Sequence, residues 1–348
     1  MHRRSILLAI LSAILFGASA PASKWLLVEL SPFQLAGFLY LGAALAVTPS
    51  AFSKDPTSVS IIGDRRNRLK LLGAVVFGGI LGPILLLFGL RLAEASAVSL
   101  WLNLELAATA VIGVIFFRDH LSPLAWVGVF FAIFAALLLT WSQGSVGISA
   151  GVLVLAACIC WGLDNHLTAL IDGISPSQST FWKGLVAGVV NLSIGIALAP
   201  LNLELTSVSS ALIVGGLCYG VSIVLYIKSA HEMGATRAQV VFSSAPFFGV
   251  ALSVLFLGES VTSKHLIAAA LFVIAIVLLL RDSHIHTHKH HFLRHRHYHT
   301  HEDDHHSHHI DSAHPDYHSH IHEHASSEHK HPHWPDIHHR HSHNDDDG

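Results

Sequence analysis

Charged residues are scarce in this sequence. Only 12% of its 348 residues are Asp, Glu, Lys or Arg, whereas soluble domains carry about 25%. It has three cysteines (Cys158, Cys160 and Cys218), and each lies in an apolar run. Three thiols placed in this way give no disulfide framework. The composition therefore excludes an ordinary soluble domain and a small disulfide-stapled secreted domain.

Two further absences narrow the chemistry. The sequence contains no G-x-x-x-x-G-K loop, so we do not expect direct drive by ATP. It contains no catalytic constellation of nucleophile and base, so we do not expect an enzyme. Nor do we expect nucleic acid among its partners.

The residues that are present divide the chain into two unlike parts. Residues 1–282 hold 15 Lys or Arg against 12 Asp or Glu, a net charge of +3. Residues 283–348 hold 5 against 11, a net charge of −6, together with 25 of the 30 histidines. The first part predicts a membrane domain, and the second predicts a polar tail that begins just after Arg281 and Asp282.

Apolar segments of spanning length fill the first part. A helix that crosses a bilayer needs about 20 apolar residues. The segments of this kind are 5–24, 33–51, 69–90, 95–117, 122–141, 148–170, 180–200, 208–229, 236–257 and 262–281. We therefore predict an all-α membrane protein with ten transmembrane helices.

Basic residues predict the orientation. With a cytoplasmic N-terminus, the outer side receives only Lys24, Arg91 and Lys264. The inner side receives more basic residues, as the positive-inside rule requires: Arg3, Arg4, Lys54, Arg65, Arg66, Arg68, Lys70, Arg118, Lys228 and Arg237. Ten spans return the C-terminus to the cytoplasm, so we predict a multi-pass protein of the cell inner membrane with both termini cytoplasmic.

The sequence also repeats itself. Residues 113–128 and 253–268 align at a spacing of 140, which places Asp119 on Glu259. An odd number of helices in each half orients the halves oppositely, as in the inverted repeats of many secondary transporters. We predict one five-helix repeat at 1–141, a second at 142–282, and a disordered tail at 283–348. Arg3 and Arg4 followed by an apolar run could instead be a signal peptide, but the repeat gives the first span a partner later in the chain.

Several short motifs carry a resemblance to a known family. They are Phe16-Gly17 with Lys24, Trp161-Gly162, Leu104-Glu105 and Leu257-Gly258-Glu259-Ser260. Over about residues 5–281 the chain resembles the EamA-type transporters of the drug/metabolite transporter superfamily. The resemblance implies ten helices in two inverted EamA-like repeats, alternating access and transport of small solutes. Leu106 departs from the family's usual proline, and the long histidine tail is not a general family feature.

Glu105 is the first candidate for the transport pathway. A carboxylate at the centre of a membrane helix costs about 2.5–3.5 kcal/mol on insertion scales. On a regular helix Trp101, Glu105 and Thr109 share one face, which suits the wall of a polar cavity. The alternative is a protonated glutamate that hydrogen-bonds a neighbouring helix as part of the packing.

The run Asp164-Asn165-His166 is the second candidate. Successive helical residues are about 100° apart, so Asp164 and His166 point about 200° apart and cannot both face one cavity. We expect Asp164 in the cavity, with His166 either there or satisfied in the core. Asn165 and Asn103 complete the predicted pathway, where hydrogen bonds between helices are their simplest role. Lys183, at a predicted helix end, is expected to extend to the membrane surface.

These side chains allow two chemistries. The acids could carry protons as access alternates, or Glu105, Asp164 and His166 could ligate Zn²⁺, Co²⁺ or Ni²⁺. Cys158 and Cys160 could add soft ligands, although buried cysteine usually behaves as a small apolar residue.

The tail carries the most specific chemical signal. Imidazole is a good ligand for transition metals, and few apolar residues are present to form a core. We predict no obligatory cofactor but binding of Zn, Ni or Co ions, with a non-selective metal buffer or a pH-sensitive polycation as alternatives. The predicted ligands are His284, His286, His288, His290, His291, His305, His306, His308, His309, His318, His320, His322 and His324.

Two functions fit these features best. The first is a secondary active transporter that couples export to protons and to divalent metal ions collected by the tail. The second exports a small organic metabolite such as an amino acid, and the tail only senses or buffers metal. A non-transporting metal sensor explains the duplicated halves poorly. The expected partners are the lipid bilayer and a small solute or metal ion, and a homodimer stays open.

Overall fold

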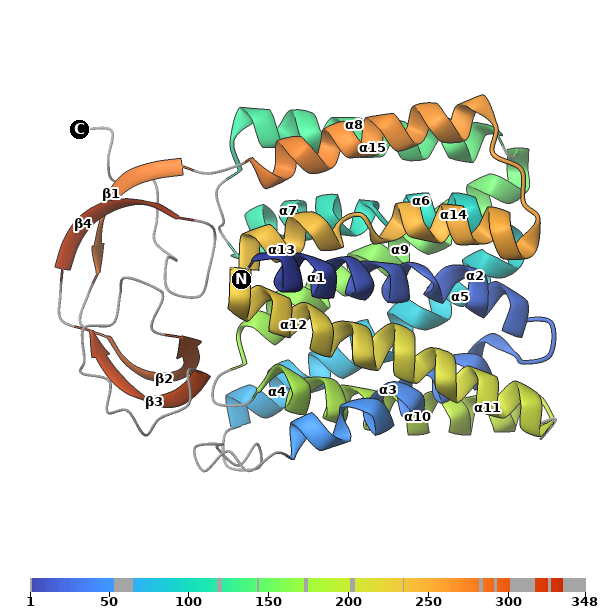
Figure 1. Ribbon diagram of the computed structural model, residues 1–348, viewed down its shortest axis with the longest axis horizontal. Coiled ribbons are helices and arrows are strands. Elements are labelled where there is room, and N and C mark those ends of the chain that lie inside the picture. Colours follow the sequence, from blue (N-terminus) through green and yellow to red (C-terminus); the bar gives the residue numbers. More distant parts are fainter. Residues whose placement is uncertain are drawn as a thin grey trace.

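The computed structural model describes most of the membrane domain and part of the tail. The described residues are 2–52, 65–117, 121–142, 144–171, 175–200, 204–233, 235–281, 284–290, 293–300, 317–324 and 327–333. Arg118, Asp119 and the basic loop up to Asp64 lie outside this set. Seen from the side, the helices run roughly parallel to one another in one bundle (Figure 1).

Within the described residues, ten spans are long and apolar enough to cross a membrane, as predicted. Several are divided into shorter helices. The helices are α1 His2–Gly17, α2 Ser19–Leu26, α3 Pro32–Ala51, α4 Arg65–Ala74, α5 Gly82–Leu92, α6 Ala95–Trp101, α7 Leu104–Phe117, α8 Pro123–Ser142, α9 Gly144–Ala169, α10 Pro176–Leu198, α11 Leu205–Val214, α12 Ser222–Met233, α13 Ala235–Phe242, α14 Ala245–Leu257 and α15 Ser263–Leu280. Two π-helical turns, η1 Val75–Leu81 and η2 Gly215–Val221, interrupt the third and eighth spans.

Two of the spans begin with a capping box. The Ser31 side chain accepts from the backbone N–H of Gln34, and the Gln34 side chain accepts from the backbone N–H of Ser31. Ser175 and Gln178 make the same pair of bonds at the start of α10. In both cases a proline follows the capping serine, where its missing N–H costs nothing.

The two halves are inverted repeats, as predicted. The π-helical turns η1 and η2 lie exactly 140 residues apart, and so do the first residues of α8 and α15. Helix α3 packs on its counterpart α10, and α8 packs on its counterpart α15. Each helix can pack on its own copy only beside a two-fold axis, so these two pairs locate the pseudo-symmetry axis of the bundle.

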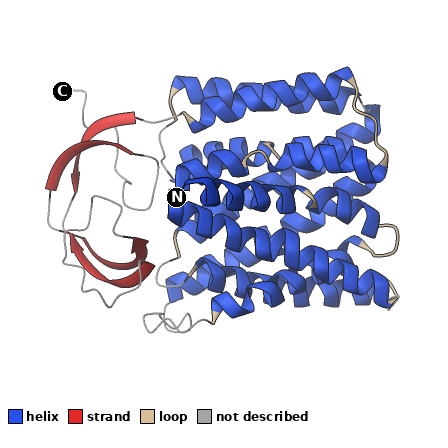
Figure 2. Cartoon of the chain, viewed as in Figure 1, coloured by secondary structure: helices blue, strands red, loops and turns tan. Residues whose placement is uncertain are grey.

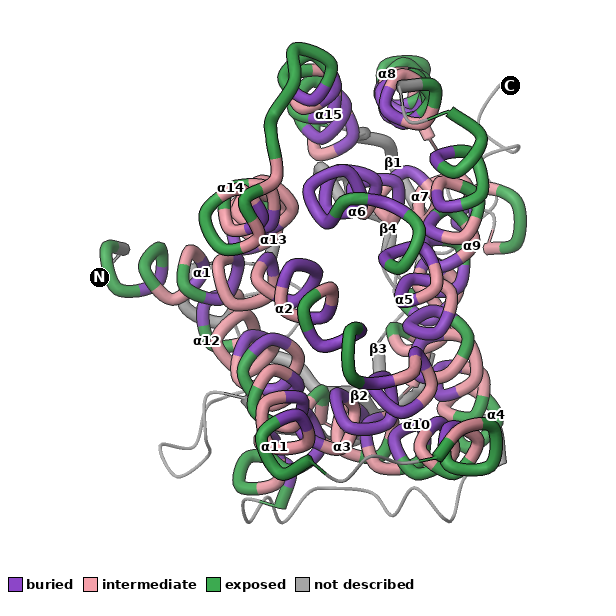
Figure 3. Tube along the Cα trace, turned by 90° about the vertical axis from the view of Figure 1, so that its right-hand side faces the viewer, coloured by how far each residue is buried: buried purple, intermediate pink, exposed green. Residues whose placement is uncertain are grey.

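Small residues let the spans approach closely. A Cβ added to Gly42 of α3 would lie 2.2 Å from the carbonyl oxygen of Leu212 in α11. A Cβ added to Gly17 would lie 2.3 Å from that of Ala245. Close backbone contact of this kind is the usual basis of helix packing in membranes. An end-on view shows α8 and α15 together at one edge of the bundle (Figure 3).

The described part of the tail contains four strands, which the sequence analysis did not predict (Figure 2). They are β1 His284–His290, β2 Leu293–Thr300, β3 Tyr317–His324 and β4 Ser327–His333. Strand β1 pairs with β4 and β2 with β3, both antiparallel. In the tail, histidine alternates with other residues, and this period of two is typical of a β-strand. The sequence analysis did not use this pattern. Isolated two-stranded sheets are only marginally stable in water, so the all-α description holds for the membrane domain and the fold does not depend on these strands.

Candidate functional site

A buried ion pair lies at the centre of the candidate site. The Nζ of Lys183 in α10 is 2.6 Å from Oδ2 of Asp164 in α9, and it donates a hydrogen bond there. The Asp164 side chain is 6% exposed and that of Lys183 is 20% exposed. Thr168 donates a second hydrogen bond to Asp164 Oδ1 at 2.9 Å. Both carboxylate oxygens are therefore satisfied, which is what keeps a charge tolerable inside a membrane domain.

The π-helical turn η1 makes room for this carboxylate. A Cβ on Gly78 would lie 2.0 Å from Asp164 Oδ2, so only glycine fits there. A π-helical turn also frees backbone carbonyls, and such turns occur frequently at functional sites. The Gly78 carbonyl accepts hydrogen bonds from Tyr40 Oη at 2.5 Å and from Trp161 Nε1 at 3.1 Å. Two aromatic side chains are thereby fixed beside the ion pair.

The depth of the ion pair follows from these neighbours. Asp164 lies only five residues before Ala169, the last residue of α9, so it is not central in its own helix as the sequence suggested. However, Tyr40 lies near the middle of α3, and Gly78 lies near the middle of the third span. Helical side chains lean toward the N-terminus of their helix, which carries the Asp164 carboxylate back toward mid-depth.

Glu105 belongs to the same charged region. Asn165 Nδ2 donates to Glu105 Oε1 at 3.0 Å and to the Thr109 hydroxyl at 3.3 Å. Glu105 also interacts electrostatically with Asp164 and Lys183. Asn165 thus joins α9 to α7, the role expected for it. That Glu105, Asn165 and Asp164 line the transport pathway stays a prediction.

His166 points away from Asp164, as the spacing on a regular helix requires. Its Nε2 lies 2.9 Å from the Thr109 carbonyl oxygen, and its ring stacks on Phe117 at a centroid distance of 4.4 Å. These contacts join α9 to α7. Of the two readings that the sequence left open for His166, the packed histidine accounts for its geometry.

Trp101 and Asn103 have partners elsewhere. A short break separates α6 from α7, where Asn103 N–H bonds to Leu100 O and Glu105 N–H bonds to Leu102 O. Hydrogen bonds between residues three apart wind the chain more tightly than an α-helix. Residues before and after the break therefore do not share the face that an unbroken helix would give them. The Trp101 ring is buried and donates to Ala136 O of α8 at 3.2 Å, and the Asn103 amide donates to Leu100 O. Trp101 therefore does not continue the face of Glu105 and Thr109.

Lys183 is the site residue that the sequence analysis misplaced. The expected span began at residue 180, which put Lys183 at its end and predicted contact with the membrane surface. The capping box at Ser175 starts α10 at Pro176 instead, so Lys183 lies two turns inside the helix. The pattern Ser-Pro-x-Gln, present at both Ser31 and Ser175, is the signal that locates this lysine correctly.

The acids, histidine and cysteines do not converge as metal ligands. Within the described residues no group of three or more His, Cys, Asp or Glu side chains is placed to hold a metal ion. Cys158 is buried and its Sγ contacts the Trp101 carbonyl oxygen at 3.8 Å. Among the predicted tail ligands, His291, His305, His306, His308 and His309 lie outside the described residues. The others lie in β1 and β3, where the structure gives backbone register only.

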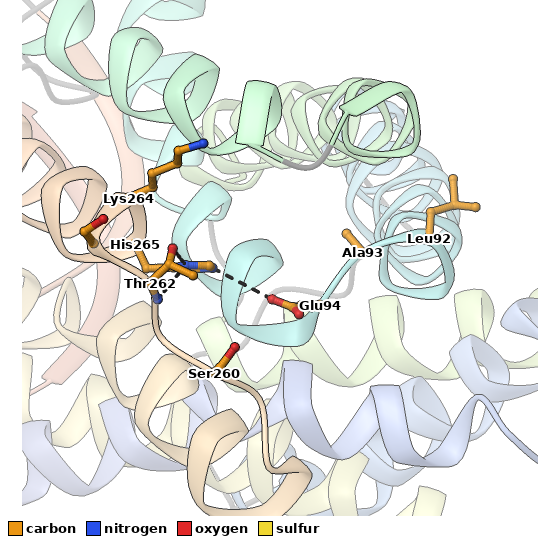
Figure 4. A pocket seen from close by; sticks show the side chains of 8 residues that line it. Leu92, Ala93, Glu94, Ser260, Thr262, Lys264 and His265 are labelled. Carbon is orange, nitrogen blue, oxygen red and sulfur yellow. Dashed lines mark hydrogen bonds and ion pairs between the residues drawn. The ribbon is translucent and has the colours of Figure 1, made fainter.

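Two cavities in the described part of the chain lie away from the ion pair. One, of about 560 Å³, lies between α8 and α9 and has Trp101 and mostly apolar side chains in its wall. The other, of about 390 Å³, lies between the α5–α6 turn and the start of α15 (Figure 4). Neither is lined by Glu105, Asp164 or Lys183. In this conformation Asp164 and Lys183 contact each other, and Glu105 is hydrogen-bonded to Asn165.

Ten spans in two inverted halves, with an ion pair buried between helices, define a multi-pass membrane transporter. The chain belongs to the EamA-like transporter family: the family model matches residues 3–141 and again 148–281. Family and superfamily are therefore those that the sequence motifs suggested, and transport of small solutes follows from the family. Transporter families of this kind are usually not enzymes.

Curated relatives agree with this assignment. The chain is 26% identical over 296 residues to an "Uncharacterized transporter" of Methanothermobacter thermautotrophicus, covering 78% of this chain and 84% of the relative. It is 24% identical over 294 residues to the "Uncharacterized inner membrane transporter YicL" of Salmonella typhimurium, covering 81% and 96%. A solved structure titled "Crystal structure of protein" superposes with a TM-score of 0.55 at 14% identity, over 81% of this chain and all of that one. That likeness concerns the fold alone.

Proposed function

We propose that this transporter moves a small organic solute that carries a carboxylate, of the amino-acid class, through a site centred on Asp164 and Lys183. The observation that carries the proposal is the 2.6 Å contact between these two side chains. An ammonium group inside a membrane domain is costly, and among the described residues Lys183 forms its ion pair with Asp164. A solute carboxylate is chemically equivalent to that partner and can replace it.

The same contact disfavours a metal ion as the cargo at this position. A divalent cation needs several anionic or neutral ligands directed at one point. Here the cation position beside Asp164 is already taken by Lys183, whose charge repels a second cation. We therefore favour the organic solute over the metal-linked export that the sequence also suggested.

Proton coupling follows from the charge balance of the exchange. When a solute carboxylate binds Lys183, Asp164 loses its ionic partner. A buried carboxylate without a partner takes up a proton rather than stay charged. Solute and proton then cross together, and the direction of transport, import or export, follows the sum of the two gradients.

Transport by purified protein in liposomes tests this function. Wild type should take up one or more of a panel of labelled amino acids, with proton movement that a pH-sensitive dye inside the liposomes records. Lys183→Met should abolish both signals, whereas Lys228→Met, which removes an exposed lysine, should keep them. If the protein transports Zn²⁺ or Ni²⁺, and this transport requires Asp164 but is unchanged in Lys183→Met, the hypothesis of a metal cargo is restored.

For the tail we propose binding of divalent transition metals on the cytoplasmic side, separate from the cargo route. Histidine content supports this, and so does the strand register: His284 and His286 of β1 lie opposite His333 and His331 of β4. The tail and the N-terminus lie at the same end of the bundle (Figure 1), which supports placing both termini in the cytoplasm of a cell with an inner membrane.

A further inference from the structure

The cavity of about 390 Å³ is a candidate binding site that the central ion pair does not use. It lies at the end of the bundle opposite the N-terminus and the tail (Figure 1). One wall is the α5–α6 turn at Glu94, and the other is the start of α15 with Ser260, Lys264 and His265 (Figure 4). Its volume falls within the range of about 300–1,000 Å³ that is usual for small-molecule sites.

His265 presents an unused polar atom to this cavity. The residue is only 4% exposed, and within the described part of the chain its Nε2 has no hydrogen-bond partner. The backbone N–H of Thr262 donates to His265 Nδ1 as part of a capping box at the start of α15. The Thr262 hydroxyl lies 2.8 Å from the same ring nitrogen. Thr262 therefore occupies Nδ1, and Nε2 is the ring nitrogen left for a ligand. The nearest acidic oxygen to Nε2 is Oε2 of Glu94, which is 4.0 Å away.

Glu94 is free to face that nitrogen because another acid caps its helix. It occupies the N-cap position of α6, where a side chain normally accepts the first N–H groups, but it makes no capping bond. Glu259, from the end of α14, accepts from Ala95 N–H at 2.7 Å and from Ser96 N–H at 2.8 Å instead. Lys24 holds the same turn through Leu90 O and Ala93 O. The turn is thus fixed without the Glu94 carboxylate, which is about half exposed.

The inverted repeat supplies an internal comparison. At the spacing of 140 residues, Thr262 and His265 correspond to Ser122 and Ala125. Ser122 caps the start of α8 by accepting from Ala125 N–H at 3.2 Å. The first half thus starts the equivalent helix with a hydroxyl cap and no imidazole. An imidazole is therefore not needed to start this helix, and a buried Nε2 without a hydrogen bond points to a ligand.

We propose that this cavity binds a small zwitterion, with its carboxylate toward His265 and Lys264 and its ammonium toward Glu94. Donors lie on the α15 wall and the acceptor on the opposite wall, so a solute with both groups bridges the two. The choice of solute class rests on the proposed function, whereas the site itself does not. With both termini in the cytoplasm, the cavity opens on the external side and offers cargo a second site there.

Saturation-transfer NMR on the full chain in lipid nanodiscs tests the proposal. The probes are glycine, L-alanine and L-leucine, with propionate and ethylamine as analogues that each keep one charged group. The background is the double variant Asp164→Leu with Lys183→Met, which removes the central site without leaving a buried charge unpaired. Any signal that remains in this background reports the cavity. We expect the amino acids to give a signal there, and propionate and ethylamine to bind at least about tenfold more weakly, the effect of losing one charged partner.

Matched variants assign the signal to the cavity. Glu94→Gln removes the acceptor charge and His265→Glu replaces the donor by an acceptor, and each should abolish the signal. His265→Gln should retain it, because glutamine completes the same capping box at Gln34 and Gln178 and still has an N–H to donate. Unchanged binding in Glu94→Gln and His265→Glu would overturn the proposal, as would no binding in the double-variant background. Transport without cavity binding refutes only this inference, and cavity binding without transport refutes only the proposed function.

Discussion

Asp164 of α9 and Lys183 of α10 form an ion pair with a distance of 2.6 Å between Oδ2 and Nζ. Breaking a buried pair by removing one partner costs about 3–5 kcal/mol, whereas replacing both partners by apolar residues is often neutral. We therefore expect Lys183→Met to lower the free energy of unfolding by about that amount. The double variant Asp164→Leu with Lys183→Met should recover most of the stability but no transport.

Denaturant titration in detergent and liposome uptake check this pair of outcomes. Lys228→Met is the control for loss of a lysine at an exposed position of α12. A double variant that transports at the wild-type rate would show that the pair is structural and not part of the site.

Gly78 should not tolerate a side chain. A methyl group there would meet Asp164 Oδ2 at 2.0 Å and Cγ at 2.2 Å, so Gly78→Ala must displace the carboxylate from Lys183. Overpacking of this kind costs about 1–3 kcal/mol, and we expect transport to fall with it. Gly216→Ala in η2 is the matched control, because its nearest neighbour atom would lie 3.4 Å away. Equal effects of the two substitutions on uptake would contradict the role given to Gly78.

We expect Glu259 to stabilise the fold by capping α6. Its carboxylate accepts from two N–H groups at the start of α6, and loss of a helix cap costs about 0.5–2 kcal/mol. Glu259→Ala should lower the thermal midpoint, which a melting curve in detergent records. Glu204→Ala is the control, since Glu204 is the N-cap of α11 but makes no capping bond. If both variants melt alike, the Glu259 contacts contribute no stability.

Deletion of residues 284–348 separates the tail from transport. The deletion removes 25 histidines and should abolish binding of several Zn²⁺ or Ni²⁺ ions, measured by equilibrium dialysis and elemental analysis. Uptake of amino acids in metal-free buffer should stay at the wild-type level, because the Asp164–Lys183 site lies wholly within the membrane domain. A shortened chain that binds metal like the full chain would place the metal site elsewhere.

Sequence reasoning located the elements better than the partners of single side chains. The apolar spans and the 140-residue spacing between Asp119 and Glu259 predicted ten helices in two inverted halves, because hydrophobic length and repetition are properties of the chain itself. The spacing of Asp164 and His166 correctly predicted that they point apart. The helix start at Pro176 was missed although its capping box is present in the sequence, and that error alone moved Lys183 from the interior to the surface.

What the sequence alone determined is the membrane fold, its duplication and the presence of costly polar groups within apolar helices. What only the tertiary structure decided is which groups neutralise one another: Lys183 with Asp164, Asn165 with Glu105, and Glu259 with the start of α6. These contacts join residues that are 19, 60 and more than 160 positions apart. Partners at such separations depend on how whole helices pack, and hydrophobic periodicity carries no information about that packing.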